Sequence, residues 1–124
     1  MEVQGHIKFT ITQRSPNEVI AEMPVQPGIL NPFGTVNAGA TLWFADVAAS
    51  ILVLDGVDPT KGMQGFPLAI NLNANLLGNS TSGVFVAKSN YVKNGRTVKV
   101  VRTIVTEASG KLIADVTTSH VLSI

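Results

Sequence analysis

Residues 40–54 read ATLWFADVAASILVL. This apolar run of about fifteen residues is too short to span a membrane, and it predicts a helix buried inside a protein. One carboxylate, Asp46, interrupts it. Its neighbours three and four positions away on a helix are Leu42, Trp43, Ala49 and Ser50. None of these side chains can neutralise a negative charge. Asp46 is therefore expected to face a partner from elsewhere, or a cavity in which chemistry takes place.

The composition narrows the class of protein. The chain has 124 residues, which predicts a single domain over residues 1–124. Only 14% of the residues are charged, and such a low share indicates that another subunit covers part of the surface. A net charge of +1 gives no electrostatic basis for binding nucleic acid. The absence of cysteine excludes disulfides, thiolate metal sites and a cysteine nucleophile.

The two histidines, His6 and His120, are far apart and lack the spacing of metal ligands. We expect both to be surface or sheet residues, and we expect no metal ion or redox cofactor. Residues 1–8 do not place a basic segment before an apolar one, so no signal peptide is expected. The predicted location is the cytoplasm, without a membrane partner.

Alternating and β-branched runs on both sides of the helix predict strands, separated by turns rich in Gly, Pro, Asn and Ser. The expected strands are residues 7–12, 19–25, 68–76, 84–92, 97–106 and 112–124. Two strands, one long helix and four more strands predict an α+β domain, in which an antiparallel sheet of five or six strands packs on one helix. A homodimer with a continuous sheet would pair the free sheet edges with those of the second copy. The alternative is a monomer with a half-solvated sheet.

The loop before the helix, residues 26–39, is rich in Gly, Pro and Asn. Where the helix begins, its first N–H groups have no partner within the helix and suit a developing oxyanion. The small residues Ala38 and Gly39 permit close approach by a carbonyl group. Asp46 lies roughly 12 Å further along the axis, at 1.5 Å per residue. This distance favours an active site shared between the antiparallel helices of two subunits.

Residues 31–46, NPFGTVNAGATLWFAD, resemble the signature of the hotdog-fold acyl-CoA thioesterases. The resemblance is closest to the phenylacetate-pathway and 4-hydroxybenzoyl-CoA thioesterases. That branch has a Gln/Asn-x-x-Gly-x-x-His-Gly-Gly loop, followed by an apolar helix with an Asp or Glu seven residues after the second of the paired glycines. Asp46 follows Gly39 at that spacing. Residues 68–76, 93–97 and 109–114 also resemble the later strands of the family.

The resemblance implies a role for each matching residue. Asp46 would be the catalytic carboxylate, acting either as a nucleophile or as a general base that activates water. The N–H of Ala38, with that of Gly39, would polarise the thioester carbonyl. Asn31 matches an amide that reaches the same site, and Ser50 matches a hydroxyl that helps to hold the hydrolytic water.

Structural readings of these positions remain open. Asp46 could be pinned by backbone N–H groups or by an interface arginine. Asn31 could simply shape the turn before Pro32, and Ser50 could bond back to the previous helical turn. Asn37, which we place with the catalytic residues, stands where the family has His, and it could serve only as the helix N-cap.

Two further departures from the family concern the backbone donor and the CoA moiety. Ala38 stands where the family has Gly; the backbone donor is kept without strain if the φ angle of Ala38 is negative. Gly78-Asn79 stands where many relatives carry a basic residue that meets the CoA phosphates.

The expected substrate-binding residues include Gly34 of the loop and Trp43 of the helix. Trp43 packs in the core or the dimer interface, or lines the acyl pocket. Lys93 and Arg96, in a hairpin turn, are candidates for the nucleotide end of CoA.

The function predicted in this way is hydrolysis of an acyl-CoA thioester by a homodimer or a dimer of dimers, with no cofactor. One alternative is a non-catalytic protein that binds acyl-CoA or an acyl carrier. A second is a hotdog hydratase or dehydratase, which would normally pair the carboxylate with a histidine; neither the loop nor the helix contains one.

Overall fold

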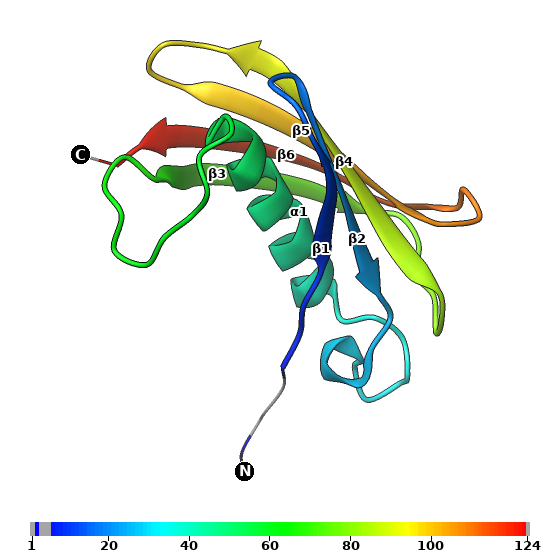
Figure 1. Cartoon of the computed structure of the whole chain (residues 1–124). Coiled ribbons are helices and arrows are strands. Elements are labelled where there is room, and N and C mark those ends of the chain that lie inside the picture. Colours follow the sequence, from blue (N-terminus) through cyan, green and yellow to red (C-terminus); the bar gives the residue numbers. More distant parts are fainter. Residues whose placement is uncertain (1, 3–5, 124) are drawn as a thin grey trace.

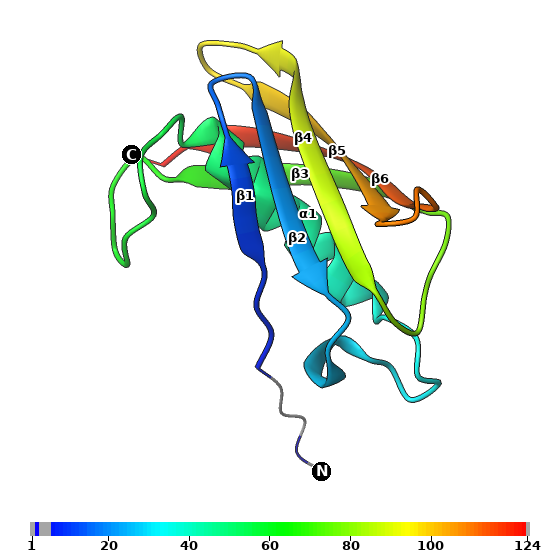
Figure 2. The ribbon, with the colours of Figure 1, turned by 45° about the vertical axis from the view of Figure 1, so that its right-hand side comes forward.

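A computed structural model describes Glu2 and residues 6–123. Its elements are β1 (Thr10–Arg14), β2 (Glu18–Pro24), a 3-10 helix η1 (Pro27–Ile29), α1 (Ala38–Val53), β3 (Pro67–Leu76), β4 (Val84–Asn94), β5 (Lys99–Glu107) and β6 (Leu112–Leu122). The strands form one six-stranded sheet in the order β1-β2-β4-β5-β6-β3. Every neighbouring pair is antiparallel, and the sheet curves around α1 (Figures 1 and 2). The predicted fold class and element order are confirmed.

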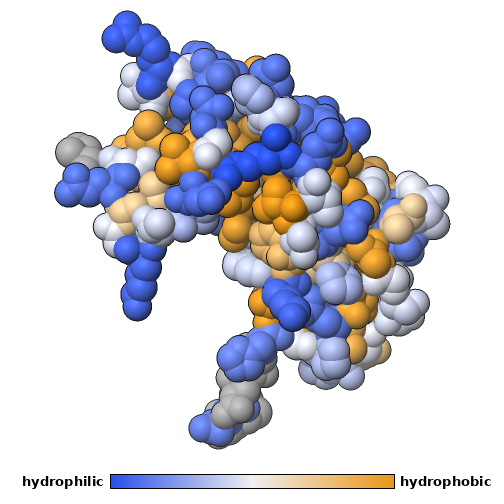
Figure 3. Space-filling model, in the orientation of Figure 1, coloured by the Kyte–Doolittle hydropathy of each residue, from blue (hydrophilic) through white to orange (hydrophobic). Residues whose placement is uncertain are grey.

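The helix packs closely on the sheet because its inner face carries small side chains. Ala45, Ala48 and Ala49 are fully buried, and Phe44 fills the space between them and the strands. Apolar burial of this kind is the main force holding the two layers together. Apolar side chains also remain visible over the middle of the face on which α1 lies (Figure 3).

The two edges of the sheet differ. β1 has five residues, with an irregular register between Ile11 and Gln13. β3 has ten residues, pairs only with β6, and leaves its other side free. Its large apolar side chains are exposed by 40–55%: Leu68, Ile70, Leu72 and Leu76. A long, apolar, unpaired edge invites pairing with another strand.

The first strand begins later than predicted, at Thr10 instead of residue 7. The Gln26 side chain occupies the backbone groups of Lys8: Lys8 N–H donates to Gln26 Oε1 at 3.2 Å, and Gln26 Nε2 donates to Lys8 O at 2.9 Å. A side chain therefore takes the place of the neighbouring strand. Gly28 lies against this segment, where a Cβ atom would come within 2.6 Å of the His6 carbonyl oxygen.

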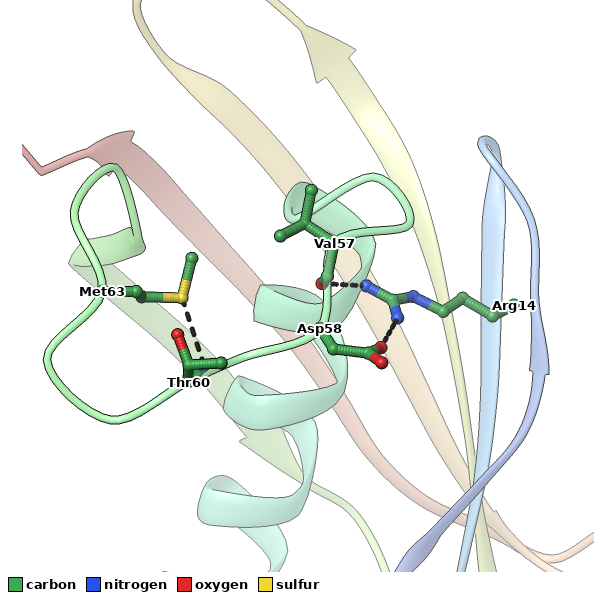
Figure 4. A network of polar contacts seen from close by, with 5 residues as sticks. All are labelled: Arg14, Val57, Asp58, Thr60 and Met63. Atoms are coloured by element: carbon green, nitrogen blue, oxygen red, sulfur yellow. Dashed lines mark hydrogen bonds and ion pairs between the residues drawn. The ribbon is translucent and has the colours of Figure 1, made fainter.

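The segment after α1 is exposed and is tied to β1 (Figure 4). Arg14 Nη1 forms an ion pair with Asp58 Oδ1 at 2.8 Å, and Arg14 Nη2 donates to the Val57 carbonyl. The Thr60 N–H donates to Met63 Sδ at 3.5 Å. Within the described residues, no helix has the length and apolar character needed to cross a membrane.

Candidate active site

The outer face of α1 carries the predicted catalytic carboxylate. After Ala38, the helix residues that are half-buried or exposed recur with helical spacing: Gly39, Leu42, Trp43, Asp46, Val47 and Ser50. Asp46 is the sole charged residue of Ala38–Val53. This less buried side of the helix, its outer face, thus carries a single charged group.

The Asp46 carboxylate has no neutralising partner among the described residues. Its Oδ1 atom is buried and accepts no hydrogen bond. The ion pairs of the described chain, Arg14–Asp58 and Arg102–Asp115, involve other carboxylates. A buried polar atom without a partner costs free energy, and such atoms concentrate where a site must bind or react. Within the single chain, nothing supports the alternative in which backbone N–H groups or an arginine hold the Asp46 carboxylate.

The start of α1 offers one free backbone donor. Asn37 is the N-cap, and its Oδ1 accepts the Gly39 N–H at 2.8 Å. The N–H groups of Ala40 and Thr41 both donate to the Asn37 carbonyl. Among the described residues, the Ala38 N–H has no acceptor. Ala38 rather than Gly39 is therefore available to a carbonyl oxygen.

The replacement of Gly by Ala at position 38 does not strain the backbone. Ala38 is exposed and is not among the residues with positive φ, so its Cβ is compatible with the local conformation. From the sequence, a negative φ at Ala38 was required for its backbone N–H to be kept without strain, and the structure agrees.

Asn31 shapes its own loop. Its Oδ1 accepts from the N–H groups of Phe33 and Thr35, and its Nδ2 donates to Thr35 Oγ1 at 2.8 Å. The turn also requires Gly34, whose φ is +84°. In the single chain Asn31 therefore shapes the turn, as the alternative interpretation predicted. A contact of Asn31 or Gly34 with substrate stays a prediction.

Ser50 and Trp43 also make structural contacts. The Ser50 hydroxyl donates to the Asp46 carbonyl oxygen at 3.0 Å, as the alternative reading expected. The Trp43 ring packs edge-on against Phe9, with centroids 5.0 Å apart. Both side chains lie on the outer face with Asp46, and their predicted roles toward water and the acyl group remain predictions.

Asn79 holds the loop that leads into the helix, which the sequence did not reveal. Its Oδ1 accepts from the Val36 N–H at 3.0 Å, and its Nδ2 donates to the Val36 carbonyl at 2.9 Å. The partners are 43 positions apart, so no local pattern could show the contact. Lys111 Nζ donates to the Asn79 carbonyl at 2.6 Å. A cation from another hairpin thus lies next to Gly78-Asn79, where the sequence lacks the basic residue of the family.

Lys93 and Arg96 lie beside the other end of the helix. They belong to the β4–β5 hairpin, and Tyr91 in the same strand donates to the carbonyl of Leu52 near the end of α1. The single chain therefore does not bring them together with Ala38. A hollow of about 270 Å³ near the same end is bounded by Val53 and Leu122, and Asp46 does not line it.

A second residue that the sequence did not single out is His120. It lies on β6, as a sheet residue, but is only 1% exposed, whereas His6 is exposed. Burial lowers the pKa of His120, and the nearby charge of Asp46 raises it by a smaller amount. A buried imidazole therefore lies within electrostatic reach of the candidate catalytic carboxylate.

Comparison with known proteins agrees with this architecture. No family model matches the sequence. A 1,4-dihydroxy-2-naphthoyl-CoA hydrolase of Listeria monocytogenes is 24% identical over 113 residues, which cover 91% of this chain and 89% of the hydrolase. A Staphylococcus aureus thioesterase, solved with a glutamine replaced by alanine, has a TM-score of 0.85 at 22% identity. The match covers 94% of this chain and 93% of the staphylococcal chain.

The chain has the hotdog fold. The same staphylococcal protein was also solved with a glutamate replaced by alanine. A Streptococcus mutans protein bound to acetyl-CoA has a TM-score of 0.83 at 19% identity, covering 98% of this chain and 94% of its own. The resemblance to hotdog thioesterases that the sequence indicated is confirmed by these relatives.

The lowered pKa of His120 predicts that the hotdog domain loses stability in mild acid. Below about pH 6.5 the unfolded chain protonates this histidine while the folded chain does not, so unfolding takes up a proton. The free energy of unfolding should fall by up to about 1.4 kcal/mol per pH unit in that window. Urea denaturation between about pH 7.5 and 5.5 measures it.

The matched control uses the other histidine. His120→Asn should flatten this dependence, whereas His6→Asn, at an exposed position, should follow the unsubstituted protein. Equal pH dependence in both variants would contradict the assignment.

Proposed function

We propose that the chain hydrolyses an acyl-CoA thioester to a free acid and CoA. The observation that carries the proposal is Asp46: a half-buried carboxylate with an unpartnered oxygen, on an otherwise apolar helix face. The free N–H of Ala38 supplies the complementary group, a preorganised donor for the thioester oxygen. No resident cofactor is part of this proposal.

Asp46 acts by one of two routes. As a general base it takes a proton from water while the water oxygen attacks the thioester carbon; the C–S bond then breaks and the thiolate recovers the proton. As a nucleophile its oxygen attacks the thioester carbon, the C–S bond breaks and CoA leaves as the thiolate; water then hydrolyses the resulting anhydride, which releases the acid and restores Asp46, and the thiolate takes up the proton that water gives up. In both routes negative charge develops on the carbonyl oxygen, where the Ala38 N–H stabilises it.

The relatives support this assignment. The Listeria protein is described as a CoA-thioester hydrolase, and the Streptococcus mutans protein was solved with acetyl-CoA. The glutamine and the glutamate replaced in the staphylococcal thioesterase are separated by the same number of positions as Asn31 and Asp46. This correspondence matches the amide and carboxylate roles proposed for the two residues.

The working unit in our proposal is a homodimer. Asp46 lies two helical turns beyond Ala38, roughly 12 Å along the axis, which is too far for both to contact one carbonyl group. A second copy with an antiparallel helix would bring its own Asp46 opposite Ala38. Pairing of the free β3 edges would make the sheet continuous and cover the exposed leucines of that strand.

The alternatives have less support. A hydratase needs a histidine in contact with substrate, and His120 is 1% exposed beneath the helix. A non-catalytic binding protein would need no unpaired carboxylate at this position. Assays of enoyl-CoA hydration and of binding without turnover distinguish the three functions.

Replacing Asp46 by Asn should abolish turnover while preserving size and shape. We expect kcat to fall roughly 10²–10⁴-fold, because amide oxygen is a poor base and a poor nucleophile. A panel of aliphatic and aromatic acyl-CoA esters, followed by thiol release, measures the effect.

The control is Asp55→Asn, an exposed position just after the helix with φ of +50°, which Asn tolerates. It should retain the full rate. Full activity of a folded Asp46→Asn protein would refute the proposed mechanism.

Ala38→Pro tests the backbone donor. Proline is well accepted at the first position of a helix, and the preceding Asn37 already has the extended φ and ψ of −65° and 132° that a residue before proline prefers. The substitution removes the N–H with little effect on folding, so kcat should fall roughly 10²–10³-fold. Thiol release together with thermal unfolding separates the two effects; an unchanged rate would exclude the Ala38 N–H as the oxyanion donor.

A further inference from the structure

His120 has one satisfied ring nitrogen and one that lacks a partner. Alternate residues of β6 are buried beneath α1: Val116, Thr118 and His120. His120 Nε2 lies 2.8 Å from Thr118 Oγ1, whereas Nδ1 is buried and has no hydrogen-bond partner among the described residues. Both nitrogens of an imidazole can form hydrogen bonds, so a buried unpaired Nδ1 requires an explanation.

Asp46, in turn, has a carboxylate oxygen that lacks a hydrogen-bond donor. Its Oδ1 is buried and unpaired, and the carboxylate is close enough for its charge to act on His120. The two atoms are not hydrogen-bonded to each other in the single chain. One is a nitrogen that can donate and the other is an oxygen that can accept, so the two unpaired atoms are chemically complementary.

Among the described residues of the elements around His120, no other charged group is free to bind it. β3 contains no titratable residue, and α1 contains only Asp46. Lys99 is opposite His120 on β5, but its Nζ is held by Asn94 and lies over the Tyr91 ring. Asp115, on β6 itself, pairs with Arg102.

We propose that His120 is a positioning residue for the catalytic carboxylate: in the assembled site its Nδ1–H donates to Asp46 Oδ1, while Nε2 accepts from the Thr118 hydroxyl. This arrangement leaves the second carboxylate oxygen of Asp46 to face the substrate. His120 remains neutral and does not contact the substrate. The inference rests on the proposed function, because it assigns a purpose to the orientation of Asp46.

The kinetic test compares two substitutions at one position. His120→Leu removes the donor, and kcat should fall roughly 10- to 100-fold at unchanged KM, the range seen when an outer partner that orients a catalytic ligand is lost. His120→Asn, whose amide nitrogen can replace Nδ1, should recover most of the rate.

In the Asp46→Asn background, His120→Leu should cause no further loss. A folded His120→Leu enzyme with the full rate would overturn the inference, as would equal losses in both backgrounds. Activity of Asp46→Asn itself would refute the catalytic mechanism, and these two failures are distinguishable.

A spectroscopic test does not depend on turnover. In ¹⁵N-labelled His6→Asn protein, His120 is the single histidine, and two-bond ¹H–¹⁵N correlation spectra report which ring nitrogen carries the proton. The inference predicts the Nδ1–H tautomer, with an Nδ1 resonance that shifts in the Asp46→Asn variant. An Nε2–H tautomer, or a spectrum indifferent to Asp46→Asn, would overturn the inference whether or not the chain is an enzyme.

Discussion

A negative charge on an apolar surface is the constraint on which this structure depends. The inner face of α1 is filled with alanines and Phe44, so the charge lies on the less buried side of the helix, with one carboxylate oxygen covered by the chain itself. On the outer face, Asp46 is surrounded by half-buried apolar residues that a single chain leaves without cover. A second chain would exclude water from this face, and exclusion of water strengthens the action of a carboxylate and an N–H dipole on a bound thioester.

The two ends of the helix perform different tasks. At its start, the Asn37 cap binds the Gly39 N–H and leaves that of Ala38 free, while Asn79 holds the preceding loop by both backbone groups of Val36. At its other end, the Tyr91 hydroxyl donates to a helix carbonyl, and Arg14 ties down the following loop. The first set of contacts leaves a backbone donor free at the start of the helix, and the second secures the helix to the sheet.

Much of this arrangement could be predicted from the sequence, because it rests on local patterns. The apolar run identified the helix, strand alternation gave the element order, and the spacing from Gly39 to Asp46 carried the resemblance. Contacts between distant segments could not be predicted. The amide of Gln26 replaces a strand partner for Lys8, and the turn containing Asn79 supports the loop at Val36. His120 looked like an ordinary strand residue because only the fold buries it beneath the helix that carries Asp46.

The central claim is that Ala38 of one chain and Asp46 of another act on the same carbonyl group. Complementation tests it most directly: Asp46→Asn and Ala38→Pro chains, each inactive alone, are refolded together and assayed for thiol release. If the site is shared, half of the dimers are mixed and each has one intact site, so about a quarter of the unsubstituted rate should return. If both groups act within one chain, no intact site can form, and a mixture as inactive as its components would contradict the account.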